Sequence, residues 1–257
     1  MSQTFVVVGG DAAGMSAAAK AKRDNPDVDV IVFEKGEWVS YGACGMPYYI
    51  EGAIEDLDQL LSLTPEEIVQ ERKIDLRRFH EVTAIDTDAK YVTVRNQSGS
   101  FQQQYDHLLL ATGAAPTVPS IQGVDLDCVF TLSSLDDAEG IREALEADAV
   151  TEDLVGTSDG EVVGFLRERD PKTVAVIGGG YIGLEMADVL QSRGCTVHLF
   201  QRSSHVLSTY DEDIAMVVEN HLRENEVSLH LDAGVTAIEQ QAGTKSVVTE
   251  GGQTPVD

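Results

Sequence analysis

The chain has 257 residues, 42% of them hydrophobic, and its 18 Lys and Arg face 44 Asp and Glu, which gives a formal net charge of −26. The hydrophobic fraction argues against a disordered chain and suffices for a sizeable core in one large or two small domains. A field this negative repels phosphate backbones, so we expect no nucleic-acid partner. No apolar run is long enough to span a bilayer and the N-terminus lacks a signal-peptide pattern, which predicts a cytoplasmic protein without a membrane partner.

The first 34 residues are typical of the start of a βαβ unit. A β-branched run at residues 4–8 is followed by a glycine-rich turn at 9–14 and an alanine-rich helical stretch at 15–23. An Asn-Pro pair stops this helix, and residues 28–33 form a second strand that ends at Glu34. The order strand, turn, helix and strand predicts a three-layer, Rossmann-like α/β fold.

The glycine turn has a physical reading as a dinucleotide site. Gly9, Gly10 and Gly14 let the backbone approach a pyrophosphate, whose charge meets amide N–H groups at the helix N-terminus. Glu34 lies 20 residues beyond Gly14, the interval expected for a carboxylate that binds the ribose hydroxyls. Asp11 replaces the middle glycine of the motif, and we expect a tolerated side chain that points away from the phosphates.

The same pattern recurs about 170 residues later. A strand at 173–177 leads into the complete motif at 178–183, then a helix to about 193 and a second strand at 196–200. One glycine motif is weak evidence, but two in strand–turn–helix context indicate an internal duplication. Gly178, Gly180 and Gly183 are therefore predicted to bind a second dinucleotide.

The acidic ribose position is lost in this second unit. Gln201 stands there and Arg202 follows it. Loss of the carboxylate removes repulsion against a 2′-phosphate, and a neighbouring guanidinium can pair with one, which favours NADPH over NADH. The alternative is that Arg202 is merely solvated.

Residues between the two units predict a small antiparallel sheet and a buried strand. Residues 82–86 and 91–95, with a turn at 97–99, are expected to form the small sheet. A capping box starts a helix at 64–67, and residues 101–113 run into a buried strand that ends in Thr112-Gly113. Residues 147–170 are acidic and aperiodic, which predicts a linker or surface insertion.

Three cysteines, at 44, 128 and 195, have no metal-site or redox CxxC spacing, which favours a reducing compartment. Cys44 is bracketed by glycines and precedes a predicted helix start, a setting that favours the reactive thiolate. The alternative for a lone cysteine is a small buried apolar group, and we interpret Cys128 and Cys195 in that way. The six histidines show no metal-ligand spacing, so we expect no metal.

Four segments together resemble one family: 6–19, 39–49, 110–116 and 176–188. They are similar to the FAD-dependent pyridine-nucleotide disulfide oxidoreductases, specifically the single-cysteine branch that contains coenzyme A disulfide reductases, NADH oxidases and NADH peroxidases. The resemblance covers nearly the whole chain except 147–170. Tyr48 and Tyr49 stand where a second redox cysteine would be, so it implies no internal redox disulfide.

The resemblance implies FAD on the first unit and NADPH or NADH on the second. Cys44 would lie beside the flavin, Tyr181 would gate the nicotinamide pocket, and Glu185 would lie near the nicotinamide. The implied cofactor-binding residues are Gly9, Gly10, Ala13, Gly14, Glu34, Lys35, Val82, Thr112 and Gly113 for FAD, and Gly178, Gly180, Tyr181, Ile182, Gly183, Gln201 and Arg202 for the nicotinamide nucleotide.

The implied reaction passes electrons from NAD(P)H through FAD to Cys44 and a low-molecular-weight disulfide such as coenzyme A disulfide. Oxidases and peroxidases of the family often carry a His where this chain has Ala12, so NAD(P)H oxidase activity is the second choice. A ferredoxin- or rubredoxin-type reductase, which would not use Cys44, is a third hypothesis.

The resemblance also implies two domains, an FAD-binding part at 1–120 and an NAD(P)-binding domain at 121–257, the second inserted in the first. Family members homodimerise and continue into a late strand, a second FAD-contacting segment and a dimerisation domain that this sequence does not contain. We therefore expect a truncated chain, with a non-catalytic fragment as a further alternative. The acidic charge indicates adaptation to high salt.

Overall fold

The computed structural model describes residues 2–146, 150–156, 162–168, 172–241 and 243–257. The chain forms two compact units. The first comprises Met1–Gly45 and Asp56–Ala115, and the second comprises Met46–Glu55 and Pro116–Asp257. The segment Met46–Glu55, which the sequence analysis placed in the first domain, thus packs with the second unit.

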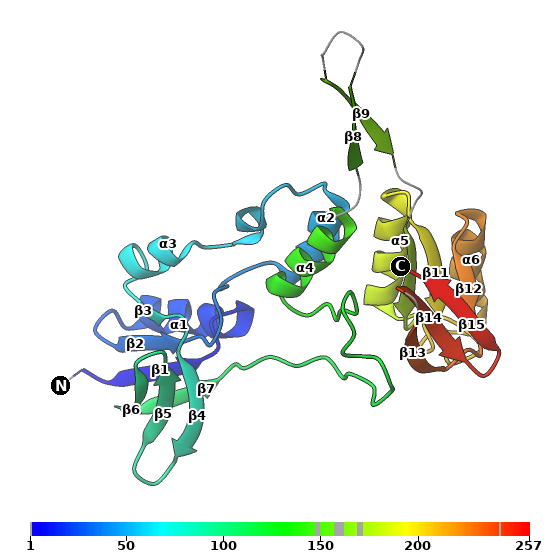
Figure 1. Ribbon diagram of the computed structural model, residues 1–257. Coiled ribbons are helices and arrows are strands. Elements are labelled where there is room, and N and C mark those ends of the chain that lie inside the picture. Colours follow the sequence, from blue (N-terminus) through cyan, green and yellow to red (C-terminus); the bar gives the residue numbers. More distant parts are fainter. Residues whose placement is uncertain (1, 147–149, 157–161, 169–171, 242) are drawn as a thin grey trace. The chain divides into compact units, whose positions relative to one another are not determined.

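The first unit is built on a parallel sheet with strand order β3-β2-β1-β7 (Figure 1). A separate antiparallel sheet, β4-β5-β6, forms from consecutive hairpins. Its elements are β1 (Thr4–Val8), α1 (Ala12–Asp24), β2 (Asp29–Phe33), the 3₁₀ turns η1 (Ala43–Gly45) and η2 (Leu57–Leu60), α3 (Pro65–Gln70), β3 (Asp75–Arg77), β4 (Glu81–Asp86), β5 (Tyr91–Asn96), β6 (Gly99–Gln104) and β7 (His107–Leu110).

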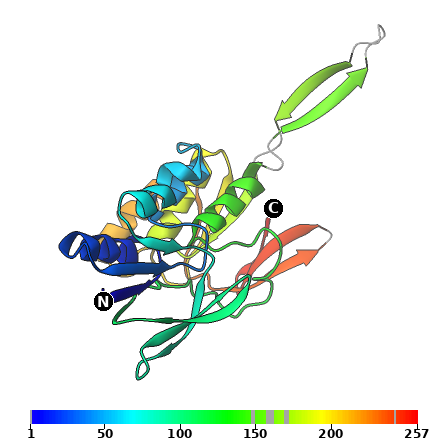
Figure 2. The same cartoon turned by 90° about the vertical axis from the view of Figure 1, so that its left-hand side faces the viewer.

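Three layers arise because the β1 side chains alternate between the two faces of the sheet. Val7 packs with Met15 and Ala18 of α1 on one face. Val6 and Val8 pack on the other face against Val92 and Val94 of β5. The antiparallel sheet therefore covers the face opposite the helices (Figures 1 and 2).

The second unit repeats this plan on a parallel sheet of order β10-β11-β12, with an antiparallel sheet β13-β14-β15. Phe200 packs against Val247 and Val256 of the antiparallel sheet, whereas α5 contacts β10 and β11. Its elements are α2 (Met46–Glu51), α4 (Leu135–Glu146), β8 (Val150–Gly156), β9 (Val162–Glu168), β10 (Thr173–Ile177), α5 (Tyr181–Ser192), β11 (Thr196–Phe200), α6 (Glu212–Glu224), β12 (Ser228–His230), β13 (Val235–Gln241), β14 (Thr244–Thr249) and β15 (Gly252–Val256).

The mixed α/β architecture with two Rossmann-like units confirms the predicted fold class. The capping box of α3 is present in both directions, from the Glu67 amide to the Thr64 hydroxyl and from the Thr64 amide to the Glu67 carboxylate. Within 147–170, β8 and β9 form an antiparallel hairpin, a regular structure that the aperiodic composition did not predict. Residues 147–149, 157–161 and 169–170 of that insertion lie outside the described residues.

Candidate functional site

The first glycine loop joins the end of β1 to α1. Gly9 has a φ of +108°, which favours glycine, and a Cβ on Gly14 would lie 1.9 Å from the Gly9 carbonyl oxygen. Both residues therefore have to be glycine for the helix to start this close to the strand. The exposed Ala13 follows in the first turn of α1. This backbone cradle fits the pyrophosphate of a dinucleotide.

Glu34 follows β2 and closes this cradle. Its carboxylate accepts hydrogen bonds from the backbone N–H groups of Gly10 and Gly36, both at 2.8 Å. Lys35 is exposed beside it and lines an open cavity of about 580 Å³ together with Phe79 and the Glu81–Arg95 ion pair. Both carboxylate oxygens of Glu34 are thus held just beyond the C-terminal end of β2, where a ribose would be recognised.

The remaining residues predicted for the first unit lie around the same strands. Val8 pairs with Phe33 of β2 and Leu110 of β7, which are the last residues of these parallel strands. The residues that follow the three strands therefore meet at the C-terminal end of the sheet. Thr112 and Gly113 follow β7 and are exposed. Val82 lies in β4 and packs against the cluster on the antiparallel-sheet face. The structure therefore brings together the glycine loop, Glu34, Thr112 and Gly113, whereas Val82 lies in the neighbouring layer.

The structure explains why Asp11 is tolerated. Its backbone, φ −98° and ψ −163°, closely matches that of Gly180, its counterpart in the second unit, with φ −86° and ψ −171°. This extended region is open to any residue, and a Cβ at Gly180 would meet nothing within 4 Å. The Asp11 carboxylate accepts a hydrogen bond from the Tyr41 backbone N–H at 3.2 Å.

The Cys44 segment is attached directly to the first glycine loop. The Ser40 N–H donates to the Gly10 carbonyl at 2.9 Å, and Tyr41 donates to Asp11 as described above. Beyond these contacts, the Gly42 N–H donates to the Leu60 carbonyl at 2.8 Å. Cys44 itself is exposed in the 3₁₀ turn η1, and α2 begins two residues later. A hydrogen-bonded loop thus presents the thiol to solvent.

The second glycine loop has the same construction. Gly178 has a φ of +111°, and a Cβ on Gly183 would lie 1.8 Å from the Gly178 carbonyl oxygen. Ile182 and Tyr181 are exposed in the first turn of α5, and Glu185 is exposed one turn later. The Tyr181 hydroxyl donates to the Tyr210 hydroxyl at 2.9 Å, and this hydrogen bond raises the pKa of Tyr181. This loop also fits a dinucleotide pyrophosphate.

Gln201 occupies the place of Glu34 in the second unit. Its side-chain oxygen accepts a hydrogen bond from the Gly179 backbone N–H at 3.0 Å, as Glu34 does from Gly10. Arg202 is exposed, and within the described part of the chain no side chain forms an ion pair with it. The role predicted for Gln201 and Arg202 at a 2′-phosphate stays a prediction.

The duplication extends into a second loop that sequence reasoning missed. Val39 and Ser40 correspond to Val206 and Leu207, because Ser40 donates to the Gly10 carbonyl and Leu207 to the Gly179 carbonyl. Ser40 and Leu207 share a left-handed backbone, with φ of +52° and +48°. A buried valine five residues after Glu34 or Gln201 is the signal that could have revealed this hydrogen-bonded loop.

The other two cysteines differ from one another. Cys195 is half-buried, and burial raises the pKa of its thiol. The prediction that Cys128 is buried is wrong: this residue is exposed and has a φ of +61°. Its position in the irregular stretch before α4 leaves its side chain outside the core.

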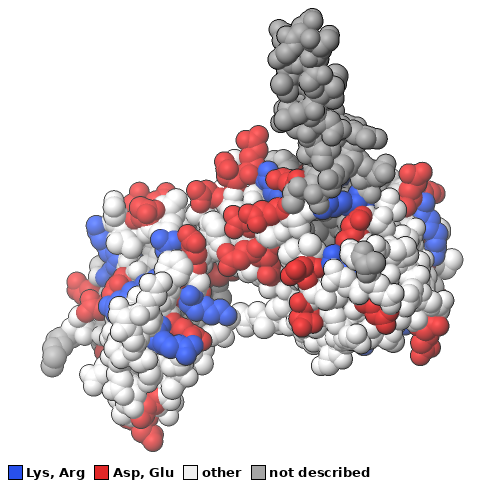
Figure 3. Space-filling view, in the orientation of Figure 1, with Lys and Arg blue, Asp and Glu red and all other residues white. Residues whose placement is uncertain are grey.

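The described residues contain no group of three or more His, Cys, Asp or Glu placed to hold a metal ion. None of their helices combines the length and apolar character that a membrane span needs. Acidic side chains are spread over the face shown in Figure 3.

The fold and the paired loops define a protein with two dinucleotide-binding units. Residues 3–257 match the family model described as pyridine nucleotide-disulphide oxidoreductase. The chain therefore belongs to this family, which is FAD-dependent.

Three relatives illustrate the similarity. An NAD(P)H sulfur oxidoreductase (CoA-dependent) from Pyrococcus abyssi is 39% identical over all of this chain and 52% of its own length. A reduced CoADR-RHD from Bacillus anthracis has a TM-score of 0.87 at 31% identity, covering 100% of this chain and 43% of that one. A water-forming NADH oxidase from Lactobacillus brevis bound to NADH has a TM-score of 0.85 at 30% identity, covering 100% and 52%. The chain spans about half the length of the curated relatives it matches.

Proposed function

We propose that the protein is a flavin-dependent NAD(P)H reductase in which Cys44 receives the electrons and reduces a low-molecular-weight disulfide such as coenzyme A disulfide. One observation carries this proposal: the Cys44 segment is hydrogen-bonded to the first glycine loop, from Ser40 to Gly10 and from Tyr41 to Asp11. These hydrogen bonds fix the position of the loop that carries the thiol relative to any dinucleotide bound at the glycine loop. The names of the P. abyssi and B. anthracis relatives support the substrate class.

The two units would hold different cofactors. The first would bind FAD through its glycine loop, Glu34, Lys35 and Thr112-Gly113, and the second would bind NAD(P)H through its glycine loop, Gln201 and Arg202. When bound, these two cofactors supply hydride and electron transfer. The exposed Tyr181 and Glu185, one turn apart on α5, would contact the nicotinamide.

The chemistry of Cys44 follows thiol–disulfide exchange. Its thiolate attacks one sulfur of the substrate RS–SR, forms a Cys44–S–S–R mixed disulfide and expels one RS⁻. Two electrons that originate in NAD(P)H then cleave this mixed disulfide, restore the Cys44 thiolate and release the second RS⁻. The sum is RSSR + NAD(P)H + H⁺ giving two RSH and NAD(P)⁺.

Neither of the other cysteines suits this role. The raised pKa of Cys195 keeps its half-buried thiol protonated, and the thiolate is the nucleophile. Cys128 is exposed but lies in an irregular stretch remote in sequence from both glycine loops. Cys128→Ser is therefore a matched control for Cys44→Ser.

The second unit is proposed to prefer NADPH, because Gln201 is neutral and Arg202 can pair with a 2′-phosphate. Replacement of Arg202 by Ala should weaken NADPH binding about tenfold or more and leave NADH binding nearly unchanged. Fluorescence titration with both nucleotides measures this directly. Equal loss of both affinities would contradict the assignment.

NAD(P)H oxidase activity is the second candidate, since the L. brevis relative is named a water-forming NADH oxidase. The two functions separate on oxygen: an oxidase consumes oxygen in step with NAD(P)H without any disulfide. Anaerobic turnover that depends on added coenzyme A disulfide favours the reductase.

We also propose that the protein works at high salt in the cytoplasm. The net charge of −26 repels itself at low ionic strength, and salt screens this repulsion. The urea midpoint of unfolding should therefore rise between 0.1 and 2 M KCl. A midpoint that falls or stays constant would contradict halophilic adaptation.

The decisive experiment compares wild-type, Cys44→Ser and Cys128→Ser proteins after incubation with FAD in molar KCl. Wild type and Cys128→Ser should reduce coenzyme A disulfide with NADPH, whereas Cys44→Ser should lose this activity and keep dye reduction. Unchanged disulfide reduction in Cys44→Ser would support a ferredoxin-reductase type of mechanism instead. A chain that retains no FAD would identify it as a fragment that cannot function alone.

A further inference from the structure

Glu219 is a buried carboxylate that the proposed function does not use. It lies on α6 with 3% of its surface exposed, and the other buried polar residue of the described chain is Ser40. Burial of a carboxylate is costly unless charged or hydrogen-bonded groups compensate it. The partners of Glu219 therefore indicate what the residue does.

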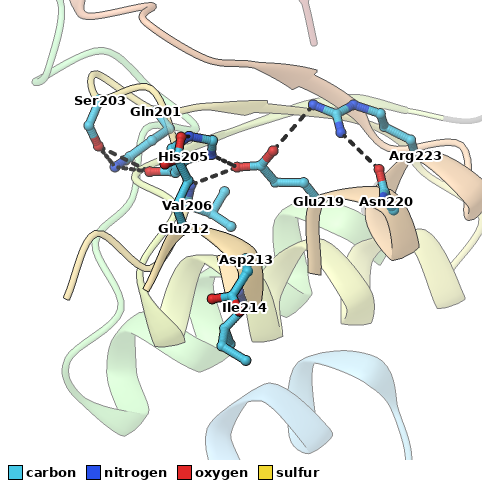
Figure 4. Close-up of polar contacts among 10 residues, drawn as sticks. All are labelled: Gln201, Ser203, His205, Val206, Glu212, Asp213, Ile214, Glu219, Asn220 and Arg223. Carbon is cyan, nitrogen blue, oxygen red and sulfur yellow. Dashed lines mark hydrogen bonds and ion pairs between the residues drawn. The ribbon is translucent and has the colours of Figure 1, made fainter. Parts of the chain in front are cut away.

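These partners come mainly from the loop that follows β11 (Figure 4). One carboxylate oxygen lies 3.0 Å from Nδ1 of His205 and accepts the Val206 backbone N–H at 3.2 Å. The other oxygen lies 3.5 Å from the Arg223 guanidinium, one turn further along α6. Glu219 thus fastens the loop to the helix.

His205 stands between two carboxylates. Its Nε2 atom lies 2.7 Å from Glu212, while its Nδ1 faces Glu219. Both ring nitrogens can donate only in the imidazolium form. The hydrogen bonds to Glu219 and then Glu212 raise the pKa of His205. Both acidic residues lie on α6, and Glu212 is in its first turn.

The backbone of His205 connects these contacts of Glu219 to the two residues that flank Arg202. Its carbonyl accepts hydrogen bonds from the Gln201 side-chain amide at 3.2 Å and from the Ser203 hydroxyl at 3.1 Å. The Gln201 amide also donates to the Ser203 hydroxyl. Gln201 and Ser203 flank Arg202, so the residues on both of its sides are held by the same carbonyl. At its other end, the Gln201 amide oxygen accepts from Gly179 of the glycine loop.

We propose that Glu219 and His205 are positioning residues for Arg202. They fix the backbone on both sides of the guanidinium so that it meets the 2′-phosphate of a nucleotide, and the preference for 2′-phosphorylated nucleotides depends on a protonated His205. This inference rests on the proposed nucleotide site of the second unit. The charged groups that face His205 are Glu212 and Glu219, with Arg223 behind Glu219.

The test uses 2′,5′-ADP and 5′-ADP as probes, measured by calorimetry on the whole chain at constant KCl concentration. These probes need neither flavin nor turnover. Wild-type protein should bind 2′,5′-ADP more tightly, and Glu219→Gln should lower this preference about tenfold, a change of about 1.4 kcal/mol, without weakening 5′-ADP. Glu224→Gln, an exposed carboxylate on the same helix, is the matched control and should behave as wild type.

The pH profile separates positioning from general stability. The 2′-phosphate, with a second pKa near 6, is already about 90% ionised at pH 7, so its own titration contributes little above that pH. The wild-type preference should fall as His205 deprotonates, and His205→Gln should show a low, flat preference. An NMR titration of the His205 ring should follow the same midpoint, which Glu219→Gln should shift to lower pH.

Two results would overturn the inference. If wild type discriminates between the probes and both Glu219→Gln and His205→Gln discriminate equally well, Arg202 needs no positioning by this network. If wild type binds neither probe, the proposed nucleotide site falls and the inference falls with it. His205→Gln leaves the Val206 contact of Glu219 intact, so it decides the question if Glu219→Gln does not fold.

Discussion

The two units share a hydrogen bond at the start of the first strand but differ in the strands of their parallel sheets. In the first, the Asp106 carboxylate accepts the Thr4 N–H at 2.7 Å, and β7 follows at once and pairs with β1. In the second, the Asp257 carboxylate accepts the Thr173 N–H at 2.6 Å in the same way. Among the described residues no strand pairs with the outer edge of β10. The hydrogen bond between the first strand and this carboxylate is therefore a feature that both units share.

A second difference concerns the loop after the second strand. In both units this loop donates a backbone hydrogen bond to the glycine loop, from Ser40 in the first and from Leu207 in the second. In the second unit this loop then leads to α6, whereas in the first it continues into the Cys44 turn and α2. The Cys44 turn, where we propose that the chemistry takes place, therefore lies just beyond a structural feature that both units share.

The largest effect is expected from Gly14→Ala and Gly183→Ala. In each case the new Cβ would meet a backbone carbonyl within 2 Å, so we expect a loss of about 3 kcal/mol or more in the free energy of unfolding. Gly180→Ala is the matched control and should change stability by less than about 0.5 kcal/mol, because its Cβ has open space. Urea unfolding measures all three, and a tolerated Gly14→Ala would show that the two loops are not equivalent.

Hydrogen exchange tests the difference between the sheets. β1 has a partner strand on each side, so its amides should be protected throughout. Apart from the Thr173 N–H, which the Asp257 carboxylate accepts, the β10 amides that point away from β11 should exchange roughly a hundredfold faster than their β1 counterparts. Exchange measured by NMR in D₂O gives both rates in one sample, and equal protection would mean that the outer edge of β10 is covered.

Phe79 and Asp232 test a shared strained position. Both precede an antiparallel sheet and have positive φ, +58° and +51°. Aspartate and asparagine tolerate this region, whereas a bulky aromatic residue does not. Phe79→Asn should therefore raise the free energy of unfolding by about 0.5–1 kcal/mol, and Asp232→Asn should leave it nearly unchanged. A destabilised Phe79→Asn would show that contacts of the ring, such as the Arg78 guanidinium 5.8 Å from its centroid, outweigh the strain.

The smallest effect is the pH dependence that His205 gives the second unit. Its folded pKa is raised by Glu219 and Glu212, so its stabilisation is complete below the unfolded value of about 6.5 and is lost as pH rises through the folded pKa. The urea midpoint should fall over this window in wild type and less in His205→Gln. His198 and His230, whose pKa values burial lowers, act in the opposite direction and only below about pH 6.5.

Local signals in the sequence were enough to predict the two units. Gly14 and Gly183 allow close approach of strand and helix, and the β-branched runs before them allow buried parallel strands, so both βαβ starts were predictable. The motif spacing also predicted that Gln201 takes the place of Glu34, and the structure shows this equivalence in the contacts of Glu34 with Gly10 and of Gln201 with Gly179.

Long-range contacts could not be predicted in this way. The attachment of Tyr41 to Asp11 and the burial of Glu219 under the loop after β11 both depend on segments brought together only by folding. Cys128 was misplaced because cysteines are usually buried, and its neighbours carry no periodic pattern that reveals an exposed loop.

The most direct test of the central claim is to locate the thiol that reacts. The protein with bound FAD is treated with one equivalent of coenzyme A disulfide without oxygen, and peptides are mapped by mass spectrometry before and after NADPH. We predict a coenzyme A mixed disulfide on Cys44 that disappears after NADPH, while the exposed Cys128 stays unmodified. An adduct on Cys128 instead, or a Cys44 adduct that NADPH leaves in place, would contradict the assignment of Cys44 as the redox centre.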